Sequence, residues 1–289
     1  MDGDHLKSLI SKTHFSRRDF VITGVTTGFA LAAQPVQAQT IITTDAKGLI
    51  AEAVQIPVSD GKIPAYYARP DGKHSYPVVL VIQEIFGLHE HIQDICRRLA
   101  KAGYFAVAPA LYARQGDPSK ISDIQTLLKE IVSKVPDAEV ASDLDATVAW
   151  AKNDKHADIG RLAVTGFCWG GRQVWLYAAH NRHLRAAVAW YGPVAGTTDE
   201  LHPKRVLDLA RDIHAPVLGL YGAADQGIAV ADVEKLRDEL KAAHKYCKLV
   251  IYPDTPHGFN ADYRPSYRPE AAKDGWKRML EWFKQHGVA

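Results

Sequence analysis

Cysteine is scarce in this sequence. Only three cysteines occur in 289 residues, and their odd number leaves at least one thiol outside any intramolecular disulfide, so the chain is not a disulfide scaffold. A charge imbalance is also missing, because 35 Lys and Arg residues stand against 33 Asp and Glu residues and leave a net charge of +2. This balance gives no indication of nucleic-acid binding or of a strongly acidic partner.

Long apolar runs are absent as well. A membrane-spanning helix needs about 18 to 20 consecutive apolar residues. No segment approaches that length, so we expect no stable membrane association. With 47% hydrophobic and 24% charged residues, the chain is of the globular class and can bury a full core. The length alone fits one large α/β domain as well as two small ones.

The first 38 residues are predicted to be an export signal. The segment Ser16-Arg17-Arg18-Asp19-Phe20 precedes a moderately apolar stretch at 21–33, and Val36-Gln37-Ala38 ends that stretch with small residues at a cleavage site. The arginine pair resembles a twin-arginine signal, which directs bacterial export of folded proteins. We therefore expect a mature chain that begins near Gln39 and is periplasmic or secreted. The alternative is a disordered basic leader with a weak apolar patch.

Strand and helix patterns alternate through the remaining residues, 39–289, which we expect to form one domain. A hairpin pattern at 51–58 and 62–69 predicts an antiparallel sheet edge, and the β-branched run at 77–82 predicts a strand buried on both faces. The further predicted strands are 104–108, 161–165, 186–190, 216–221 and 248–252, and the predicted helices are 90–102, 121–132, 139–151, 172–179, 230–243 and 271–285. This alternation is typical of a doubly wound, mainly parallel sheet.

The segment Gly166-Phe167-Cys168-Trp169-Gly170 follows a predicted strand and precedes a predicted helix. It has the spacing of the G-x-S-x-G nucleophile elbow, with Cys168 in place of serine. The elbow needs glycine at 166 and 170 because its strained backbone packs closely against its neighbours. The helix that begins after Cys168 directs its N-terminal N–H groups at the sulfur and favours a thiolate. The alternative is a small core cysteine, since free cysteines are among the most buried residues.

The other two cysteines are expected to be structural. Cys96 falls in an amphipathic helical pattern, and Cys247 falls at the start of a strand. A free thiol in an exported protein is exposed to oxidation. A catalytic function of Cys168 would explain why the protein keeps a free thiol despite this exposure to oxidation.

A thiol nucleophile needs a base and a group that orients the base. In an α/β-hydrolase sheet, the acid and the histidine follow the nucleophile in sequence, each on a loop after a strand. Asp225 and His257 each follow a predicted strand, so the order Cys168, Asp225, His257 predicts a catalytic triad. Asp254 is the alternative acid, although its surroundings are typical of a turn. The segment His89-Glu90-His91 lacks the histidine spacing of a metal site on a helix.

Five segments, taken together and in order, resemble the dienelactone hydrolase (carboxymethylenebutenolidase) family of the α/β-hydrolase superfamily. They are Gln83-Glu84-Ile85-Phe86-Gly87, Leu111-Tyr112-Ala113-Arg114, Gly166-Phe167-Cys168-Trp169-Gly170-Gly171, Gly222-Ala223-Ala224-Asp225 and His257-Gly258-Phe259. The resemblance extends from about Ile50 to His286. It implies an α/β-hydrolase fold without a large cap domain, and a hydrolase that opens a dienelactone-type enol lactone or cleaves a small carboxylic ester. No metal or organic cofactor is implied.

The resemblance also implies roles for four side chains. These are Cys168 as the nucleophile, Asp225 as the acid, His257 as the base, and Glu84 as a carboxylate that helps deprotonate the thiol when substrate binds. The last role is physically reasonable, because a buried carboxylate that loses a stabilising contact becomes a stronger base. The implied intermediate is an acyl thioester on Cys168.

Substrate binding is assigned by the same resemblance. The backbone N–H groups of Ile85 and Trp169 would form the oxyanion hole, as the elbow geometry also predicts. Arg114 matches a family arginine that pairs with a substrate carboxylate, for which the forked guanidinium is suited. An ordinary surface arginine is the alternative for this position.

The sequence departs from the family at one position. Members that cleave dienelactones carry a second carboxylate-binding arginine four residues after the histidine, where this chain has Ala261. Arg264 is a candidate replacement. Trp190 and Tyr191 follow a predicted strand and are candidates for lining the substrate pocket, with a core position as the alternative.

The sequence therefore favours an enzyme that acts on a small-molecule ester or lactone, as a monomer or a small homo-oligomer. One alternative is a broad carboxylesterase or thioesterase without lactone preference. Another is a non-catalytic binding or redox-thiol protein on the same scaffold, although such a protein would not need Asp225, His257 and Glu84 together.

Overall fold

The computed structural model describes residues 41–289. The predicted export signal at 1–38 lies outside the described residues, and the predicted domain at 39–289 is described from residue 41 onward. No helix within 41–289 is long and apolar enough to span a membrane.

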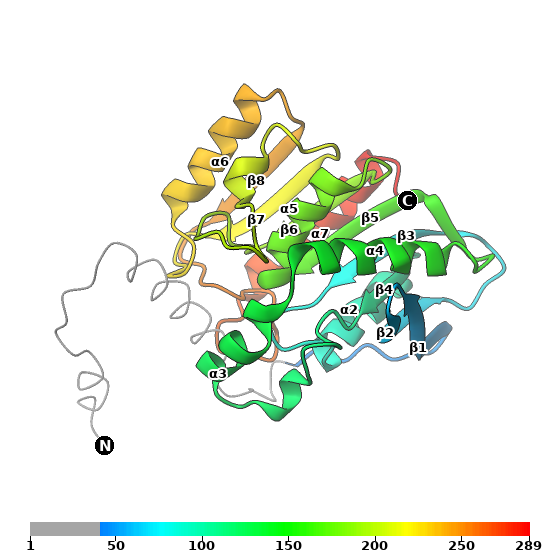
Figure 1. The fold of residues 1–289 in the computed structure, drawn as a ribbon. Helices are drawn as coiled ribbons and strands as arrows, with labels where there is room; N and C mark the ends of the chain where they lie inside the picture. The colour runs from blue at the N-terminus through cyan, green and yellow to red at the C-terminus, as the bar shows by residue number, and fades with distance from the viewer. Residues whose placement is uncertain (1–40) are drawn as a thin grey trace, which may run out of the picture.

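An eight-stranded sheet runs through the centre of the molecule, in the strand order β1-β2-β4-β3-β5-β6-β7-β8 (Figure 1). The strands are β1 (Leu49–Val58), β2 (Gly61–Pro70), β3 (Tyr76–Ile82), β4 (Phe105–Pro109), β5 (Ala157–Phe167), β6 (Ala186–Trp190), β7 (Val217–Gly222) and β8 (Cys247–Tyr252). The β1–β2 and β2–β4 pairings are antiparallel, and the remaining pairings are parallel. This confirms the predicted mainly parallel sheet with an antiparallel hairpin at its edge.

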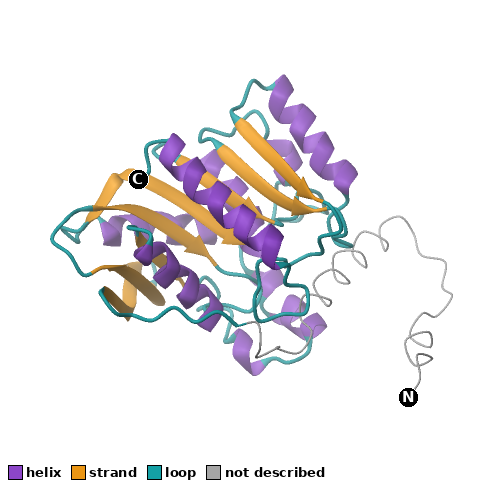
Figure 2. Ribbon diagram, turned by 180° about the vertical axis from the view of Figure 1, so that it is seen from behind, coloured by secondary structure: helices purple, strands orange, loops and turns teal. Residues whose placement is uncertain are grey.

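Helices cover both faces of the sheet. They are α2 (Glu90–Lys101), α3 (Ile124–Glu130), α4 (Asp137–Ala151), α5 (Trp169–His180), α6 (Val230–Ala242) and α7 (Pro269–Gln285), together with the short 3₁₀ turns η2 (Pro118–Lys120), η3 (Val132–Lys134) and η4 (Val206–Leu209). In Figure 1, α4 and α5 lie in front of the sheet while α2 and α7 lie behind it, and Figure 2 shows the sheet from that other side. No large cap domain covers the part of the chain at 41–289, in agreement with the predicted fold class.

Several boundaries differ from the sequence prediction, among them the start of β5 at Ala157, and two of the differences have clear local reasons. The helix predicted at 121–132 is shorter, because the Asp123 side chain accepts the N–H of Thr126 at 2.8 Å and so begins α3 at Ile124. A 3₁₀ turn then replaces its last residues. Helix α5 begins at Trp169 rather than near Arg172, because the chain turns into the helix directly at Cys168.

The fold gathers the candidate side chains at one edge of the sheet. Strand β3 is followed by Glu84, β4 by Tyr112, β5 by Cys168, β7 by Asp225 and β8 by His257. Because β3 to β8 are parallel, their carboxyl ends lie along the same edge. Open parallel sheets bind their ligands at this edge.

Candidate active site

Cys168 occupies a strained turn between β5 and α5. Its backbone has φ 57° and ψ −120°, which is unusual for a residue with a side chain. Two hydrogen bonds hold the turn, from the N–H of Cys168 to the carbonyl of Trp190 at 3.0 Å and from the N–H of Gly171 to the carbonyl of Cys168 at 2.9 Å. The thiol is buried, with 3% of the residue exposed. Strain of this kind is maintained only where the surroundings fix the backbone, and it is typical of functional sites.

The glycines beside Cys168 are required by close backbone packing. A Cβ atom on Gly166 would lie 2.5 Å from the carbonyl oxygen of Gly170, and one on Gly170 would lie 2.4 Å from the carbonyl oxygen of Gln83. Both contacts are with backbone atoms, which cannot move aside as a flexible side chain can. The turn therefore has the packing that the elbow spacing predicts.

His257 is held by a buried carboxylate. Its Nδ1 lies 2.7 Å from Oδ2 of Asp225, while Oδ1 of Asp225 accepts the N–H groups of Gly227 at 2.8 Å and Ile228 at 3.2 Å. Asp254, the alternative acid, is exposed and adopts φ 48° in a turn. Asp225 is thus the carboxylate that contacts His257, and its fixed position orients the imidazole.

The electrostatics of His257 and Cys168 are coupled. Burial alone would lower the pKa of His257, but the charge of Asp225 and of a Cys168 thiolate, with hydrogen bonds to both, outweighs burial and raises this pKa. Burial raises the pKa of Cys168, and the charge and hydrogen bond of His257 oppose that effect only in part. The negative charge of Glu84 raises the Cys168 pKa further. Burial thus favours the neutral thiol at Cys168, and the Asp225 carboxylate makes His257 a stronger base.

Glu84 is buried at the end of β3, with 3% of the residue exposed. Its Oε2 accepts the hydroxyl of Tyr263 at 2.7 Å and lies 3.4 Å from Nε2 of His89. Burial by itself would raise the pKa of Glu84, but the hydrogen bond from His89, the charges of His91 and His89, and the Tyr263 hydroxyl lower it to about 2. Burial lowers the pKa of His89 itself, so we assign the anionic charge to Glu84 and treat His89 chiefly as a hydrogen-bond donor.

The sequence did not identify Tyr263 and His89 as partners of Glu84. His89 stands out in the sequence only as part of His89-Glu90-His91, which lacks the spacing of a metal site, and it immediately precedes α2. Tyr263 lies 179 residues from Glu84 in the sequence, so no local pattern could connect the two. His91, the other histidine of this segment, places its Nδ1 3.3 Å from Oδ1 of Asp262.

The two predicted oxyanion-hole residues flank the elbow. The N–H of Trp169, the first residue of α5, hydrogen-bonds to the Cys168 side chain and acts to lower its pKa. Ile85 is buried and directly follows Glu84, at a bend where Glu84 bridges to Gly87. Both residues therefore lie at the catalytic edge of the sheet.

Arg114 has partners that its predicted role did not include. Its guanidinium donates to both carboxylate oxygens of Asp60 at 2.7 and 2.6 Å and to both of Asp143 at 2.7 and 3.0 Å. These interactions connect the β1–β2 turn to helix α4. A substrate carboxylate would have to compete for this side chain with Asp60, Asp143 and also Glu139, which lies 3.6 Å away. The binding role of Arg114 therefore stays a prediction.

Trp190 and Tyr191 occupy different environments. Trp190 is fully buried beneath the elbow, where its ring stacks on Phe167 and its indole N–H donates to Thr165 Oγ1 at 3.2 Å. Its position is that of a core residue, which is the alternative that the sequence left open. Tyr191 is also fully buried, but its ring meets the ring of His257 edge-on at 5.1 Å and its backbone has φ 37°.

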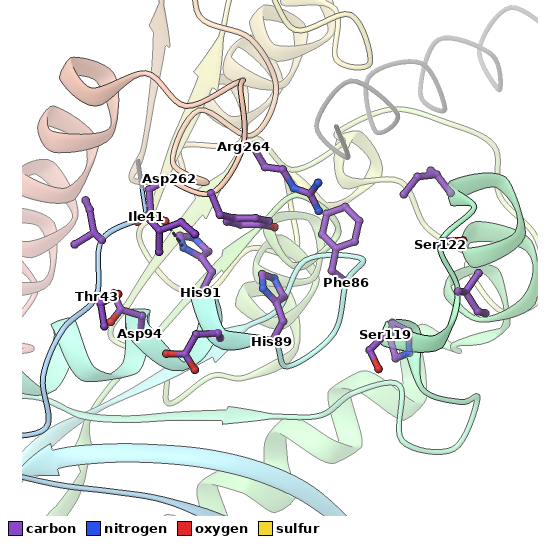
Figure 3. A pocket seen from close by; sticks show the side chains of 16 residues that line it. Ile41, Thr43, Phe86, His89, His91, Asp94, Ser119, Ser122, Asp262 and Arg264 are labelled. Carbon is purple, nitrogen blue, oxygen red and sulfur yellow. Dashed lines mark ion pairs between the residues drawn. The ribbon is translucent and has the colours of Figure 1, made fainter. Parts of the chain in front are cut away.

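Arg264 lines a cavity of about 520 Å³ next to the Glu84 contacts. Its guanidinium lies 4.6 Å from the ring centres of both Phe86 and Tyr263. Figure 3 shows Arg264 directed toward Phe86, with His89 nearby on the cavity wall. Cys168 and His257 are not among the lining residues, and the cavity is connected to the site through Tyr263 and His89, which contact Glu84.

Among residues 41–289, no group of three or more His, Cys, Asp or Glu side chains is arranged to hold a metal ion. Cys96, Cys168 and Cys247 are all free thiols.

Comparison with known proteins identifies the family. The model of the dienelactone hydrolase family matches residues 63–287. A protein of Methylorubrum extorquens, provisionally named carboxymethylenebutenolidase, is 60% identical over 288 residues, which is 100% of this chain and 99% of the relative. A protein of Escherichia coli K12 with the same provisional name is 54% identical over 263 residues, 90% of this chain and 96% of the relative.

A solved structure gives the same result. The crystal structure of a provisionally named dienelactone hydrolase from Klebsiella pneumoniae has a TM-score of 0.81 and 55% sequence identity, and the match covers 82% of this chain and 99% of that one. The predicted α/β-hydrolase fold and the predicted family are both confirmed. The chain belongs to the dienelactone hydrolase family and is an enzyme, a hydrolase of the carboxylic-ester and lactone class.

Proposed function

We propose that the chain hydrolyses a lactone or a small carboxylic ester by nucleophilic catalysis at Cys168, with His257 as the base and Asp225 as the acid that orients it. The proposal rests chiefly on one arrangement. A buried thiol on a strained elbow hydrogen-bonds to an imidazole whose far nitrogen is fixed at 2.7 Å by a buried carboxylate. This is the relation of nucleophile, base and orienting group that activates a weak nucleophile.

In the first half-reaction, the thiol proton of Cys168 passes to Nε2 of His257 as the sulfur attacks the carbonyl carbon. The negative charge then develops on the carbonyl oxygen, which the N–H groups of Trp169 and Ile85 would bind. Collapse of this intermediate breaks the acyl C–O bond, and the leaving oxygen takes the proton from His257. In a lactone the leaving oxygen stays attached to the acyl chain, so ring opening leaves the whole substrate as a thioester on Cys168.

In the second half-reaction, His257 takes a proton from water as the water oxygen attacks the thioester. The C–S bond breaks, the carboxylic acid leaves, and the sulfur regains its proton from His257. Asp225 keeps its charge throughout and stabilises the imidazolium in both steps. Only water is consumed, so the cycle needs no further reactant.

We propose that Glu84 controls when the thiol becomes reactive. In the resting site, Tyr263 and His89 stabilise the Glu84 anion, and its charge keeps the nearby thiol protonated. A substrate that displaces the Tyr263 contact would raise the pKa of Glu84, so that Glu84 accepts the thiol proton first and passes it on to His257 before the leaving oxygen takes it. The resting enzyme would thereby protect its thiol from oxidation, since the thiolate is the reactive form.

Alkylation of resting Cys168 by iodoacetamide is expected to be slow at pH 7 and to rise as the pH increases. The sign follows from the raised pKa of Cys168, because a thiol with a raised pKa keeps its proton to higher pH and only the thiolate reacts. The measurement is the alkylation rate of the Cys168 peptide by mass spectrometry between pH 6 and pH 9 (roughly the span over which thiols ionise).

Glu84→Gln provides the matched comparison for this profile. Removing the negative charge of Glu84 is expected to shift the profile of Cys168 alkylation to lower pH. Cys96 is fully buried and serves as an internal reference for unfolding, because it reacts only if the protein opens. A rate in the wild type that does not change over this pH range would contradict a protonated resting thiol.

We propose that Arg264 recognises a carboxylate or similar anion on the substrate. A guanidinium that lies 4.6 Å from the centres of two aromatic rings is held in place, and its planar N–H groups can bind a carboxylate bidentately. The cavity that Arg264 lines adjoins Tyr263, which holds Glu84, so an anion bound there is well placed to disturb that contact. This would couple substrate recognition to activation of the thiol.

The test compares a carboxylate-bearing dienelactone with p-nitrophenyl acetate as substrates, in the presence of a thiol reductant. Arg264→Gln is expected to lower kcat/KM for the dienelactone by about 10- to 100-fold, the effect of losing one charge-assisted hydrogen bond. Turnover of the neutral ester is expected to change little. Arg114→Gln removes the other candidate arginine and is the matched variant.

The pair of arginine variants separates the two assignments. A selective loss of dienelactone turnover in Arg114→Gln but not in Arg264→Gln would contradict our assignment and restore the sequence-based one. Turnover of the ester but not of the dienelactone by the wild type would favour an esterase of different specificity. Turnover of neither would refute the proposed function.

We also propose that the segment 1–38 is a twin-arginine export signal and that the mature enzyme is periplasmic or secreted. Support comes from the order of arginine pair, apolar stretch and small-residue cleavage site in the sequence. N-terminal sequencing of the protein from the periplasmic fraction is expected to begin near Gln39, and an intact Met1 in that fraction would contradict the proposal.

A further inference from the structure

Several of the buried polar side chains that lack a hydrogen-bond partner follow strands at the catalytic edge of the sheet. Within the part of the chain that the structure describes, both amide atoms of Gln83 and the hydroxyls of Tyr112 and Tyr191 are buried and lack a partner in hydrogen-bond geometry. More than about 90% of buried polar groups in proteins are satisfied. An unsatisfied group usually destabilises the fold, so several around one nucleophile indicate that a ligand completes them.

Tyr112 is the best placed of these side chains. It follows β4 at the catalytic edge, with 1% of the residue exposed, and its ring meets the ring of Trp169 edge-on at 4.8 Å. Burial raises the pKa of Tyr112 well above its ordinary value, and the charges of Cys168 and Glu84 add to that effect while Gln83 opposes it. The hydroxyl therefore lies near the thiol and keeps its proton at all working pH values, as a hydrogen-bond donor must.

The neighbours of Tyr112 place it on the oxyanion side of the thiol. Its ring packs on Trp169, which carries one proposed oxyanion-hole N–H, and its hydroxyl lies near Gln83, two residues before the other at Ile85. The base lies elsewhere, since His257 contacts Asp225 and the ring of Tyr191. The Tyr191 ring thus contacts the base, although the charges of Glu84 and Cys168 also act on its hydroxyl, whereas the Tyr112 ring contacts the residue that carries a proposed oxyanion-hole N–H.

We propose that the Tyr112 hydroxyl is a third oxyanion-hole donor, which hydrogen-bonds to the tetrahedral intermediate together with the N–H groups of Trp169 and Ile85. This inference rests on the proposed thiol mechanism and adds a catalytic residue to it. In the resting site the hydroxyl has only an interaction with Gln83 that falls short of good hydrogen-bond geometry, and it gains a charged acceptor as charge develops on the carbonyl oxygen. Such an interaction is made in the transition state and not in the ground state, so it raises kcat rather than lowering KM.

Tyr112→Phe tests the proposal because it removes only the oxygen and keeps the ring that packs on Trp169. The expected result is a fall in kcat of about 10- to 100-fold with KM nearly unchanged, somewhat less than the loss of a main oxyanion-hole donor. A trifluoromethyl ketone, which adds the thiol to form a tetrahedral oxyanion, is expected to bind more weakly by a similar factor. Thermal stability is expected to stay the same or to rise, because the variant loses an unsatisfied buried hydroxyl.

Tyr104→Phe is the matched control. Tyr104 is also buried, but its hydroxyl donates to the carbonyl of Val288 at 3.2 Å, away from the catalytic edge. This variant is expected to lose stability and to keep kcat, which is the opposite of the result expected for Tyr112→Phe. The contrast separates the loss of a structural hydrogen bond from the loss of a catalytic one.

Several outcomes would overturn the proposal. An unchanged kcat in Tyr112→Phe would exclude the hydroxyl from the oxyanion hole, and a parallel fall of kcat and melting temperature would make its role structural. A fall in kcat without weaker binding of the trifluoromethyl ketone would also contradict it. If the proposed function itself is wrong, the wild type will be inactive on these substrates. That failure is therefore recognised before the variants are compared.

Discussion

Replacing Cys168 by alanine is expected to lower kcat/KM for both the dienelactone and the p-nitrophenyl ester by at least about 10⁴-fold, as loss of a nucleophile does in other hydrolases. The sulfur supplies the bond that divides hydrolysis into two steps, and no neighbouring side chain can replace it. Alanine fits the space of the buried thiol and leaves the elbow backbone intact. The measurement is steady-state kinetics of the purified variant, with circular dichroism to establish that it is folded.

Cys247→Ala is the matched control for this variant. Cys247 begins β8, so it lies at the amino end of a strand, away from the catalytic edge, and it is only half-buried. Its loss is expected to leave kcat/KM unchanged. Full activity in Cys168→Ala would refute the thiol mechanism, and an equal loss in both variants would attribute the effect to a general requirement for thiols.

Replacing Gly166 by alanine is expected to destabilise the fold by about 3 kcal/mol or more, a cost in the range of severe core substitutions. The added Cβ atom would lie 2.5 Å from the carbonyl oxygen of Gly170 and 2.9 Å from Cβ of Ile82. Relief would require either β5 or the first turn of α5 to move, and both are fixed by the parallel sheet. The free energy of unfolding in urea and the yield of folded protein measure the effect.

Gly160→Ala tests the same change on the same strand without the clash. A Cβ atom on Gly160 would approach only Oδ1 of Asp158, at 3.1 Å. This side chain accepts hydrogen bonds from the N–H of Gly160 and from Arg161, but it is partly exposed and needs to move by only a few tenths of an ångström. Gly160 is exposed and its backbone does not require glycine. We expect less than about 1 kcal/mol of change in stability for this control. A similarly small change in Gly166→Ala would show that the elbow tolerates a side chain and that its packing is looser than described.

Much of the fold could be predicted from the sequence because its signals are strong and local. The run at 77–82 is apolar without alternation, which predicted a strand buried on both faces. These residues are indeed buried in β3, which pairs with β4 on one side and β5 on the other. Alternation of strands and helices predicted the parallel sheet. The start of α3 was not predicted, because a single hydrogen bond from the Asp123 side chain determines it.

The site was partly predictable for a topological reason. Residues that follow parallel strands meet at one edge, so the contact between Asp225 and His257 could be anticipated from their positions after β7 and β8. The partners of Arg114 could not be anticipated, because Asp60 approaches it from the β1–β2 turn and Asp143 from helix α4. Such contacts depend on how distant segments pack, and no local sequence pattern records them.

The contact between Tyr263 and Glu84 has the same origin. Tyr263 lies on the loop after His257, beside Arg264, and reaches Glu84 across the site. The sequence showed that the second carboxylate-binding arginine of the family is replaced by Ala261, but not which side chains stabilise Glu84 in the resting enzyme. The structure answers that question with a tyrosine and a histidine.

The central claim is that Cys168 carries the acyl group, and acid quenching during turnover tests it most directly. The enzyme is mixed with p-nitrophenyl acetate, quenched within the first turnover, and analysed by intact mass and peptide mapping. We predict one acetyl group per chain, located on the peptide that contains Cys168, removed by hydroxylamine as a thioester is, and absent from Cys168→Ala. Turnover with no acyl group on Cys168, or with the acetyl group on another residue, would contradict the mechanism.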